Sequence, residues 1–370
     1  MRRVEFKSPA KADVAVLSRN LELWPVLREV VDGWGVVEIE TIQSPIGLLD
    51  APRILRTMRR YGTTLGYASM VARICRSGAK VLVAVDQTVE VVEQLGRLLP
   101  EVHQVLISHG SVREERLASR RICYRRDRVL CVWGQSDVDI YRNSGEDAVS
   151  CQIVGSLRNA DYCRRTKSVA AAEPTRPLLL ISQYSGNEEE SLASTRPRDA
   201  ALRELKAHLH RYCLERELPL AIALRPPVSS PQSSGQQIAE RDHYEQVFAG
   251  VRLSFTDPTL QDATYVASDE SDVTIGVPEG ALTESFARGN KVLMFRQRLA
   301  TGSYYGFPID GDFVITEPDY WQFARRLDDL RQKSKTECAT RWRTSREYMM
   351  ANADSDLPIK LVRELIEKAL

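Results

Sequence analysis

The sequence lacks the features that mark metal-binding, secreted or membrane-spanning proteins. Its seven cysteines are an odd number and include no CxxC pair, which argues against a disulfide framework or a zinc site. No apolar run approaches the roughly 20 residues that a helix needs to cross a bilayer. Residues 1–20 are too polar for a signal peptide. We therefore expect a protein that works in the reducing cytoplasm.

Neither sign of charge dominates the chain. The 51 basic and 50 acidic residues nearly cancel, so no global field argues for a nucleic-acid partner. Seven arginines nevertheless gather between Arg113 and Arg128. Such a run is either a solvated face or a surface for an anionic acceptor or for membrane headgroups. We expect no nucleic acid, and peripheral contact with the inner membrane stays open.

Several nucleotide-handling motifs are also missing. No GxGxxG follows a predicted strand, and neither GxxxxGK[ST] nor GxSxG occurs. Hydride transfer, P-loop hydrolysis and α/β-hydrolase chemistry are therefore disfavoured. No loop carries a clear D-x-D metal motif. We expect a reaction without a metal or a resident cofactor.

What is present is a repeated alternation of strands and helices. The composition, with 43% apolar and 27% charged residues in 370, fits two globular domains. Unbroken apolar strands such as KVLVAV at 80–85 alternate with amphipathic helices, which indicates parallel sheets covered on both faces. We predict an α/β fold of two doubly wound Rossmann-like domains facing a cleft, at 1–166 and 178–350. The Ala- and Pro-rich segment 167–177 is the predicted linker, and 351–370 is predicted to pack back on the first domain.

The stretch from Ala267 to Arg296 predicts a strand, a turn, a helix and a second strand. The helix opens at Gly280 and Thr283, and Gly289 ends it where a left-handed cap is expected. Its first turn lies at the carboxyl edge of a sheet, where free backbone N–H groups favour anions. Glu284 then either accepts from the hydroxyls of a bound ribose or is a surface acid that the helix dipole favours.

Residues directly after the predicted strands form the list of candidate site residues, because ligands of open parallel sheets lie outside the carboxyl ends of the strands. They are Asp86, His109 with Gly110, Trp133 with Gly134, Gln183 with Tyr184, Arg225, and the helix start from Gly280 through Thr283 to Glu284. Together they supply an acid, a histidine, an arginine and a helix N-terminus. These groups suit a phosphate-bearing donor and a proton transfer.

Each of these residues has a structural interpretation beside the functional one. Arg225 either neutralises a nucleotide phosphate or is a surface cation. His109, followed by Gly110, either exchanges a proton with a ligand or is a structural histidine. Asp86 is a general base or nucleophile, or simply a helix N-cap.

Two further features, a segment and a histidine, also have more than one interpretation. The segment from Gly155 to Asn159 offers Ser156, Arg158 and Asn159 as donor contacts in a hinge, or it is a plain turn. His243 is expected on a helix face, in solvent or in the core. The last fifty residues predict helices at Tyr320 to Lys333, Thr336 to Met350 and Ile359 to Ala369.

Six motifs occur in a consistent order over both halves. They are KVLVAVDQT, QVLISHG, VLCVWGQSDVDIY, IVGSLRNADY, LLLISQY and SDVTIG…TESFARGNKVLMF. With them the chain resembles the GT-B class of nucleotide-sugar glycosyltransferases. More narrowly, it resembles the bacterial transferases that build lipopolysaccharide, capsule and related surface carbohydrates.

The resemblance implies that Glu284 contacts the ribose and that His109 lies at the donor–acceptor cleft. It implies a donor such as a CMP-activated ulosonic acid, for example CMP-Kdo, or a UDP-sugar, and an acceptor that is a surface polysaccharide or a lipid-linked glycan. Glycerophosphate transferases also carry an H-G pair, but Pro227 stands here where they show a second histidine. Gly276 replaces the first acid of an E-x7-E pattern, so the stereochemical course stays open.

Two alternatives share the same architecture. A sugar-nucleotide 2-epimerase would act on the donor alone, with no acceptor. A degenerate fold would bind a glycan or a protein partner without catalysis.

Overall fold

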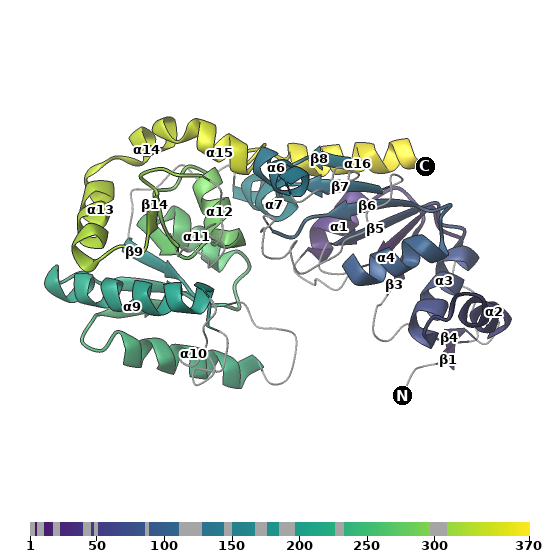
Figure 1. Ribbon diagram of the computed structural model, residues 1–370, viewed down its shortest axis with the longest axis horizontal. Coiled ribbons are helices and arrows are strands. Elements are labelled where there is room, and N and C mark those ends of the chain that lie inside the picture. Colours follow the sequence, from purple (N-terminus) through teal and green to yellow (C-terminus); the bar gives the residue numbers. More distant parts are fainter. Residues whose placement is uncertain are drawn as a thin grey trace. The chain divides into compact units, whose positions relative to one another are not determined.

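The computed structural model describes residues 4–5, 11–17, 23–39, 46–47, 51–85, 89–110, 128–143, 150–166, 176–184, 197–225, 233–296 and 309–370. The chain divides into two compact units (Figure 1). Unit 1 comprises Met1–Arg164 with Ser355–Leu370, and unit 2 comprises Arg165–Asp354. Of the predicted linker 167–177, residues 167–175 lie outside the described ranges, and Arg176 already begins a strand. Within the described ranges no helix has the length and apolarity of a membrane span.

Unit 1 is built on a six-stranded parallel sheet. Its strands are β2 (Val14–Leu17), β3 (Val36–Ile39), β5 (Val81–Val85), β6 (His103–Ile107), β7 (Arg128–Val132) and β8 (Ser150–Ile153). They lie in the order β3-β2-β5-β6-β7-β8. A separate short parallel pair joins β1 (Val4–Glu5) to β4 (Ile46–Gly47).

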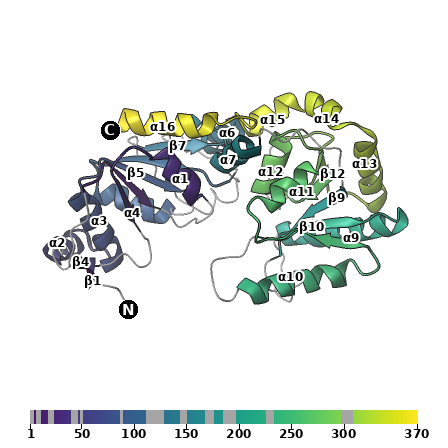
Figure 2. The ribbon, with the colours of Figure 1, turned by 180° about the vertical axis from the view of Figure 1, so that it is seen from behind.

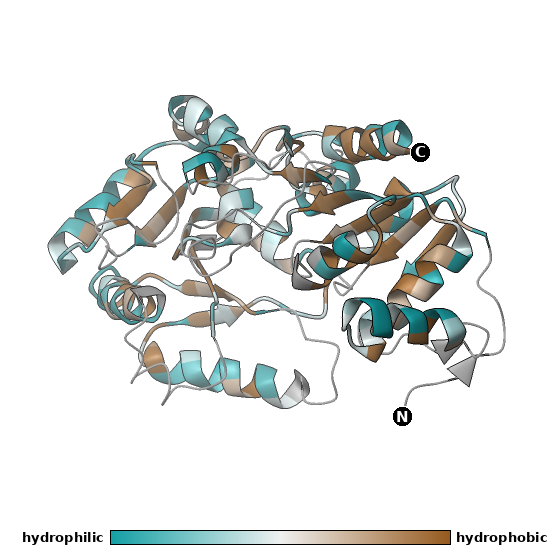
Figure 3. Ribbon diagram, turned by 45° about the vertical axis from the view of Figure 1, so that its right-hand side comes forward, coloured by the Kyte–Doolittle hydropathy of each residue, from teal (hydrophilic) through white to brown (hydrophobic). Residues whose placement is uncertain are grey.

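Helices cover both faces of this sheet. They are α1 (Trp24–Val30), α3 (Leu65–Ser77), α4 (Val89–Leu98), α6 (Gln135–Asn143), α7 (Leu157–Thr166) and α16 (Leu357–Ala369), while α2 (Ala51–Tyr61) packs on α3. Alternate residues of β5 point to opposite faces: Val81 and Val83 pack with α1, α7 and α16, whereas Leu82 and Ala84 pack with α3, α4 and α6. Burial on both faces explains why the central strand β5 is apolar throughout, and Figure 3 shows strands that are largely hydrophobic.

Unit 2 has a second six-stranded parallel sheet. Its strands are β9 (Arg176–Ile181), β10 (Leu220–Ala223), β11 (Leu253–Phe255), β12 (Ser271–Gly276), β13 (Val292–Arg296) and β14 (Val314–Thr316). The order is β11-β10-β9-β12-β13-β14. The first strand of the unit therefore lies between the second and the fourth, and the chain reverses direction across the sheet there, as it does in Rossmann domains.

The helices of unit 2 also lie on both faces (Figure 2). They are α9 (Pro197–Glu215), α10 (Ser233–Val247), α11 (Ala263–Asp269), α12 (Gly280–Ala287), α13 (Tyr320–Gln332), α14 (Lys335–Arg341) and α15 (Arg343–Met349). Leu178 and Leu180 of β9 pack in the large core with α9 and α13, while Leu179 packs with Ala267 of α11. The alternating apolar residues of one central strand thus hold both helical layers.

The predicted fold class is confirmed, because each unit is a doubly wound parallel α/β domain. Gly289 has the expected left-handed backbone, with φ of 95°. The prediction of a single helix from Thr336 to Met350 is wrong. The structure has two helices there, which divide at Trp342, whose φ is −95° and ψ is 7°. The buried indole of Trp342 lies 5.5 Å from the ring of Phe313 and donates to Asp312. These tertiary contacts fix the residue where the helix divides.

We predict that Gly289→Ala lowers the stability of unit 2. At φ of 95° a side chain is strained, and the added Cβ would lie 3.3 Å from Ala339 Cβ and from Arg346. The loss should be about 1–2 kcal/mol, measured by urea unfolding. Gly235→Ala is the matched control, because Gly235 lies within α10 with nothing within 4 Å. It should be neutral or stabilise by about 0.5–1 kcal/mol. Equal effects of the two substitutions would contradict the strain argument.

Candidate functional site

The reversal of strand order in unit 2 marks a place where a ligand binds in this class of sheet. Strands β10, β9 and β12 are neighbours, so the residues that follow them meet at one edge. Gln183 follows β9, Arg225 follows β10, and Gly280 opens α12 after β12. Six of the candidate site residues, from Gln183 to Glu284, thus belong to a single edge of one sheet.

Gln183 connects two of these strand ends. Its side chain is buried, and its Nε2 donates to the carbonyl oxygen of Val277 at 3.3 Å. The bond ties the end of β9 to the turn before α12. Gln183 therefore fixes the shape of the edge, and a contact with a donor stays a prediction.

The first turn of α12 is built from its own residues. Thr283 is fully buried, and its hydroxyl donates to the carbonyl oxygen of Glu279 at 2.7 Å. Glu279, the N-cap residue, is extended and makes no side-chain cap bond, and no acid lies in the first turn. Glu279 is therefore the acid at this helix start, and no residue of the first turn itself offsets the partial positive charge of its backbone N–H groups.

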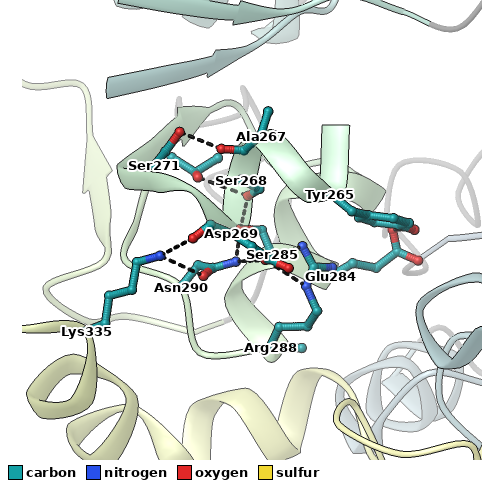
Figure 4. A network of polar contacts seen from close by, with 12 residues as sticks. Tyr265, Ala267, Ser268, Asp269, Ser271, Glu284, Ser285, Arg288, Asn290 and Lys335 are labelled. Carbon is teal, nitrogen blue, oxygen red and sulfur yellow. Dashed lines mark hydrogen bonds and ion pairs between the residues drawn. The ribbon is translucent and has the colours of Figure 1, made fainter. Parts of the chain in front are cut away.

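Glu284 is buried, with 3% of its surface exposed. Its Oε2 accepts from the hydroxyl of Tyr265 on α11 at 2.6 Å. Figure 4 shows these two side chains meeting, with Arg288 beside them. The Arg288 guanidinium lies 4.6 Å from the Tyr265 ring centroid and donates to Asp269. The interpretation of Glu284 as a surface acid is wrong, because two elements enclose the carboxylate.

The contacts around Tyr265 and Asp269 extend across α11, α12 and the start of β13. Asp269 also accepts from Asn290 Nδ2 at 2.6 Å, and Ser268 Oγ lies 3.0 Å from Thr274 Oγ1. Lys335 Nζ donates to the backbone carbonyl of Asp269 (Figure 4). The helix that carries Glu284 is thus held by polar bonds on one side.

A second buried carboxyl group lies beside Arg225. Glu240 of α10 is 3% exposed and accepts from the Ser182 hydroxyl and, at 3.4 Å, from the backbone N–H of Arg225. The Tyr244 hydroxyl donates to Ser182 Oγ at 2.9 Å. We call Ser182, Glu240 and Tyr244 the Glu240 cluster. It joins the ends of β9 and β10 to α10, and it leaves the Arg225 side chain exposed.

The residues of the Glu240 cluster were absent from the sequence-based site. Ser182 ends the motif LLLIS, but nothing in the spacing shows that a glutamate 58 positions later is its partner. His243, on the same helix, is buried, and its Nε2 accepts from Lys206 Nζ at 2.9 Å. It also lies 5.1 Å from the ring of Tyr184. The core interpretation of His243 is the one that the structure supports.

The remaining predicted site residues belong to unit 1. His109 and Gly110 follow β6, where Ser108 Oγ donates to the Gly110 carbonyl at 2.5 Å. The buried indole of Trp133, after the neighbouring β7, donates to the Ser108 carbonyl at 3.3 Å. This turn is therefore held in place while His109 is partly exposed. Asp86 lies outside the described residues.

Ser156 begins a helix. Its Oγ accepts from the backbone N–H of Asn159 at 3.2 Å, and Leu157 is the first residue of α7. Gly155, with φ of 98°, makes the turn from β8. Ser156 and Asn159 are buried and Arg158 is partly exposed. Donor contacts by Ser156, Arg158 and Asn159 stay predictions.

No metal cluster was predicted. Among the residues that the structure describes, no group of three His, Cys, Asp or Glu side chains is placed to hold a metal ion. Metal independence of the reaction stays a prediction.

Comparison with known proteins shows which solved structures share this architecture. No protein-family model and no curated protein matches the sequence, but solved structures match over nearly the whole chain. UDP-GlcNAc 2-epimerase from Methanocaldococcus jannaschii, in complex with UDP-GlcNAc and UDP, is 10% identical, with a TM-score of 0.56 over 96% of this chain and 99% of that one. The chain has the GT-B fold.

Two other structures of this fold are similar to the same degree. UDP-N-acetylglucosamine 2-epimerase from Rickettsia bellii is 8% identical, with a TM-score of 0.55 over 100% of this chain and 96% of that one. A glycosyltransferase from Rickettsia africae ESF-5 is 10% identical, with a TM-score of 0.52 over 97% and 98%. At such identities the likeness shows the fold alone.

The Glu240 carboxyl should make stability depend on pH. Burial raises its pKa above the ordinary value of 4.5, although hydrogen bonds from Ser182 and Arg225 act in the opposite direction. A carboxyl whose folded pKa is raised contributes stability below its unfolded pKa, and this stability is lost as the pH rises through the folded pKa. Glu240→Gln cannot ionise and keeps an amide oxygen as acceptor.

We therefore predict that the free energy of unfolding of Glu240→Gln, relative to the wild type, increases from about pH 4.5 toward neutrality. Urea unfolding at a series of pH values measures it. Glu245→Gln, an exposed substitution on the same helix, controls for the loss of one carboxylate. If the free energies of unfolding of Glu240→Gln and the wild type differ by an amount that is constant with pH, the raised pKa of Glu240 is contradicted.

Proposed function

We propose that this GT-B-fold protein is a glycosyltransferase that binds a nucleotide-sugar donor through unit 2. The observation that carries the proposal is the edge after β10, β9 and β12, where Arg225, the start of α12 and the buried Glu284 follow adjacent strands. The donor is a UDP-sugar or a CMP-ulosonic acid such as CMP-Kdo. A structure of the same fold with UDP-GlcNAc and UDP supports testing UDP-sugars first.

In this proposal the phosphates lie at the N-terminus of α12 and against Arg225. Backbone N–H groups and a guanidinium stabilise the departing phosphate, so neither a metal nor a cofactor is required. Glu284 accepts from the ribose, within a pocket wall that Gln183, Gly280 and Thr283 shape. The bond from Tyr265 orients this carboxylate before the ribose arrives.

The chemical step belongs to unit 1 in this proposal. His109, beside Gly110, or Asp86 removes the proton from an acceptor hydroxyl, which then attacks the sugar. Ser156, Arg158 and Asn159 contact the donor. The acceptor is a surface polysaccharide or a lipid-linked glycan, the second of which requires contact with a membrane.

Arg225→Ala should weaken binding of a nucleoside diphosphate by about 10- to 100-fold, because a charge-assisted bond to phosphate is lost. Binding of the corresponding nucleoside should change little. Isothermal titration with UDP, CMP and uridine measures this. Arg252→Ala is the matched control, since Arg252 is exposed on unit 2 just before β11, at the opposite edge of the sheet.

The contrary outcomes are distinct. Equal losses in Arg225→Ala and Arg252→Ala would show a general charge effect and no phosphate site. The proposal would also be contradicted if no nucleotide of the CMP, UDP and GDP series bound the wild type at millimolar concentration. That result would favour a non-catalytic binding protein.

A second candidate is sugar-nucleotide 2-epimerisation, favoured by the similarity to two epimerases of known structure. We predict that UDP-GlcNAc alone is not converted, because a transferase needs an acceptor. Chromatography of the reaction mixture should show incorporation of the sugar only after a polysaccharide or lipid-linked acceptor is added. A chelator should not prevent this incorporation, because the proposed mechanism needs no metal.

Release of UDP and a free 2-epimer without acceptor would establish the epimerase instead. A strict need for Mg²⁺ or Mn²⁺ would contradict the metal-independent mechanism. Glu284→Gln serves as the control variant for either reaction, because it alters the proposed ribose contact in both.

A further inference from the structure

The region from Ala51 to Val85 contains no aspartate or glutamate, although the whole chain has nearly equal numbers of acids and bases. Helix α2 alone carries four arginines: Arg53, Arg56, Arg59 and Arg60. Arg73, Arg76 and Lys80 follow in the same region. This part of unit 1 is therefore strongly positive while the chain as a whole is neutral.

One side of α2 packs against α3. Ile54 is buried and packs with Ala68 and Ala72 of α3, and Met58 lies against the same cluster. Figures 1 and 2 both show α2 beside α3, β4 and β1, at the end of unit 1. This inner side fixes the helix, so its outer side has a defined position.

The outer side of α2 is basic and also apolar. Its four arginines are exposed. Among them Leu55 is 65% exposed, and Tyr61 at the end of the helix is 47% exposed. Leu65, which begins α3, is exposed as well. We call Arg53, Leu55, Arg56, Arg59, Arg60, Tyr61 and Leu65 the α2 surface.

The charges of the α2 surface are not balanced within the described part of the chain. No described carboxylate lies within ion-pair distance of Arg53, Arg56, Arg59 or Arg60. The Arg60 guanidinium lies 5.2 Å from the Tyr61 ring centroid, a cation–π contact that keeps its charge. A negative partner would therefore meet guanidinium groups that need not first break an ion pair with a described residue.

The mixture of groups identifies the partner. A soluble polyanion would need the arginines alone, and an apolar protein surface would be opposed by them. An anionic bilayer satisfies both parts, because guanidinium groups bind headgroup phosphates while leucine and tyrosine enter the interface. We propose that the α2 surface docks unit 1 on an anionic lipid membrane.

This proposal deepens the proposed function, on which its biological purpose rests, because docking would bring a lipid-linked acceptor to the enzyme. Membrane binding is measured without turnover. A protein that binds vesicles but no nucleotide, or the reverse, would separate the two proposals.

The experiment is co-sedimentation of the full chain with vesicles of phosphatidylglycerol mixed with phosphatidylcholine, and with vesicles of phosphatidylcholine alone. The wild type should bind the anionic vesicles, less so as salt is raised, and should not bind the neutral ones. Each basic residue near such a surface contributes roughly fivefold in affinity. Arg56→Glu with Arg59→Glu should therefore reduce binding by about 25-fold or more.

Leu55→Ser should reduce binding by about tenfold, since an apolar side chain no longer enters the interface. Ile238→Ser is its matched control, because Ile238 is 63% exposed on α10 of unit 2. Arg325→Glu with Arg343→Glu, two exposed arginines of unit 2, is the control for charge reversal. Both controls should bind vesicles like the wild type. Circular dichroism melting confirms that each variant is folded.

Two outcomes would overturn the proposal. One is that the wild type binds no anionic vesicle at low salt, or that the α2 variants bind as well as their controls. The other is that charge reversal abolishes binding, Leu55→Ser has no effect, and double-stranded DNA competes with the vesicles. That second result would assign the α2 surface to a soluble polyanion.

Discussion

A buried carboxylate must receive hydrogen bonds, and this requirement determines how the carboxyl edge of unit 2 is built. Glu284 and Glu240 are both almost fully enclosed, and an ionised carboxyl group without partners in such surroundings would cost several kcal/mol. Tyr265 donates to the first, and Ser182 with the Arg225 backbone donates to the second. Helix α10 is therefore fixed to the ends of β9 and β10, and α11 to α12, by polar bonds in addition to their apolar packing.

The two carboxyl groups have different consequences for a ligand. Glu240 bonds to residues of the scaffold and positions the backbone of Arg225, so its effect on a phosphate would pass through that residue. Glu284 lies one turn into α12, and its hydrogen bond to Tyr265 fixes the orientation of one oxygen. Rigid support of this kind lowers the conformational entropy that binding would otherwise cost. The edge is thus preorganised on both sides of β9.

The sequence predicted the elements whose formation depends on local pattern. The apolar run at Val81–Val85 indicated a strand buried on both faces, and Gly289 indicated a left-handed helix end. The short β14 was missed, because three residues carry too little periodicity. The partners of the buried carboxyl groups were missed for a different reason. Ser182 lies 58 positions from Glu240, and Tyr265 lies 19 positions from Glu284, so only the folded chain brings them together.

Other arginines of the chain show why the positive charge of α2 is informative. Several arginines elsewhere in the chain are paired within the fold: Arg288 with Asp269, Arg216 with Asp328 and Arg211 with Glu215. Four arginines on three turns of helix repel one another at i,i+3 and i,i+4 spacings, which opposes helix formation unless packing or a partner compensates. Ile54 and Met58 supply the packing, yet they would do so equally well with acids interspersed on the outer face. The exclusion of acids from this outer face therefore points to a demand from outside the fold, and an anionic surface meets it.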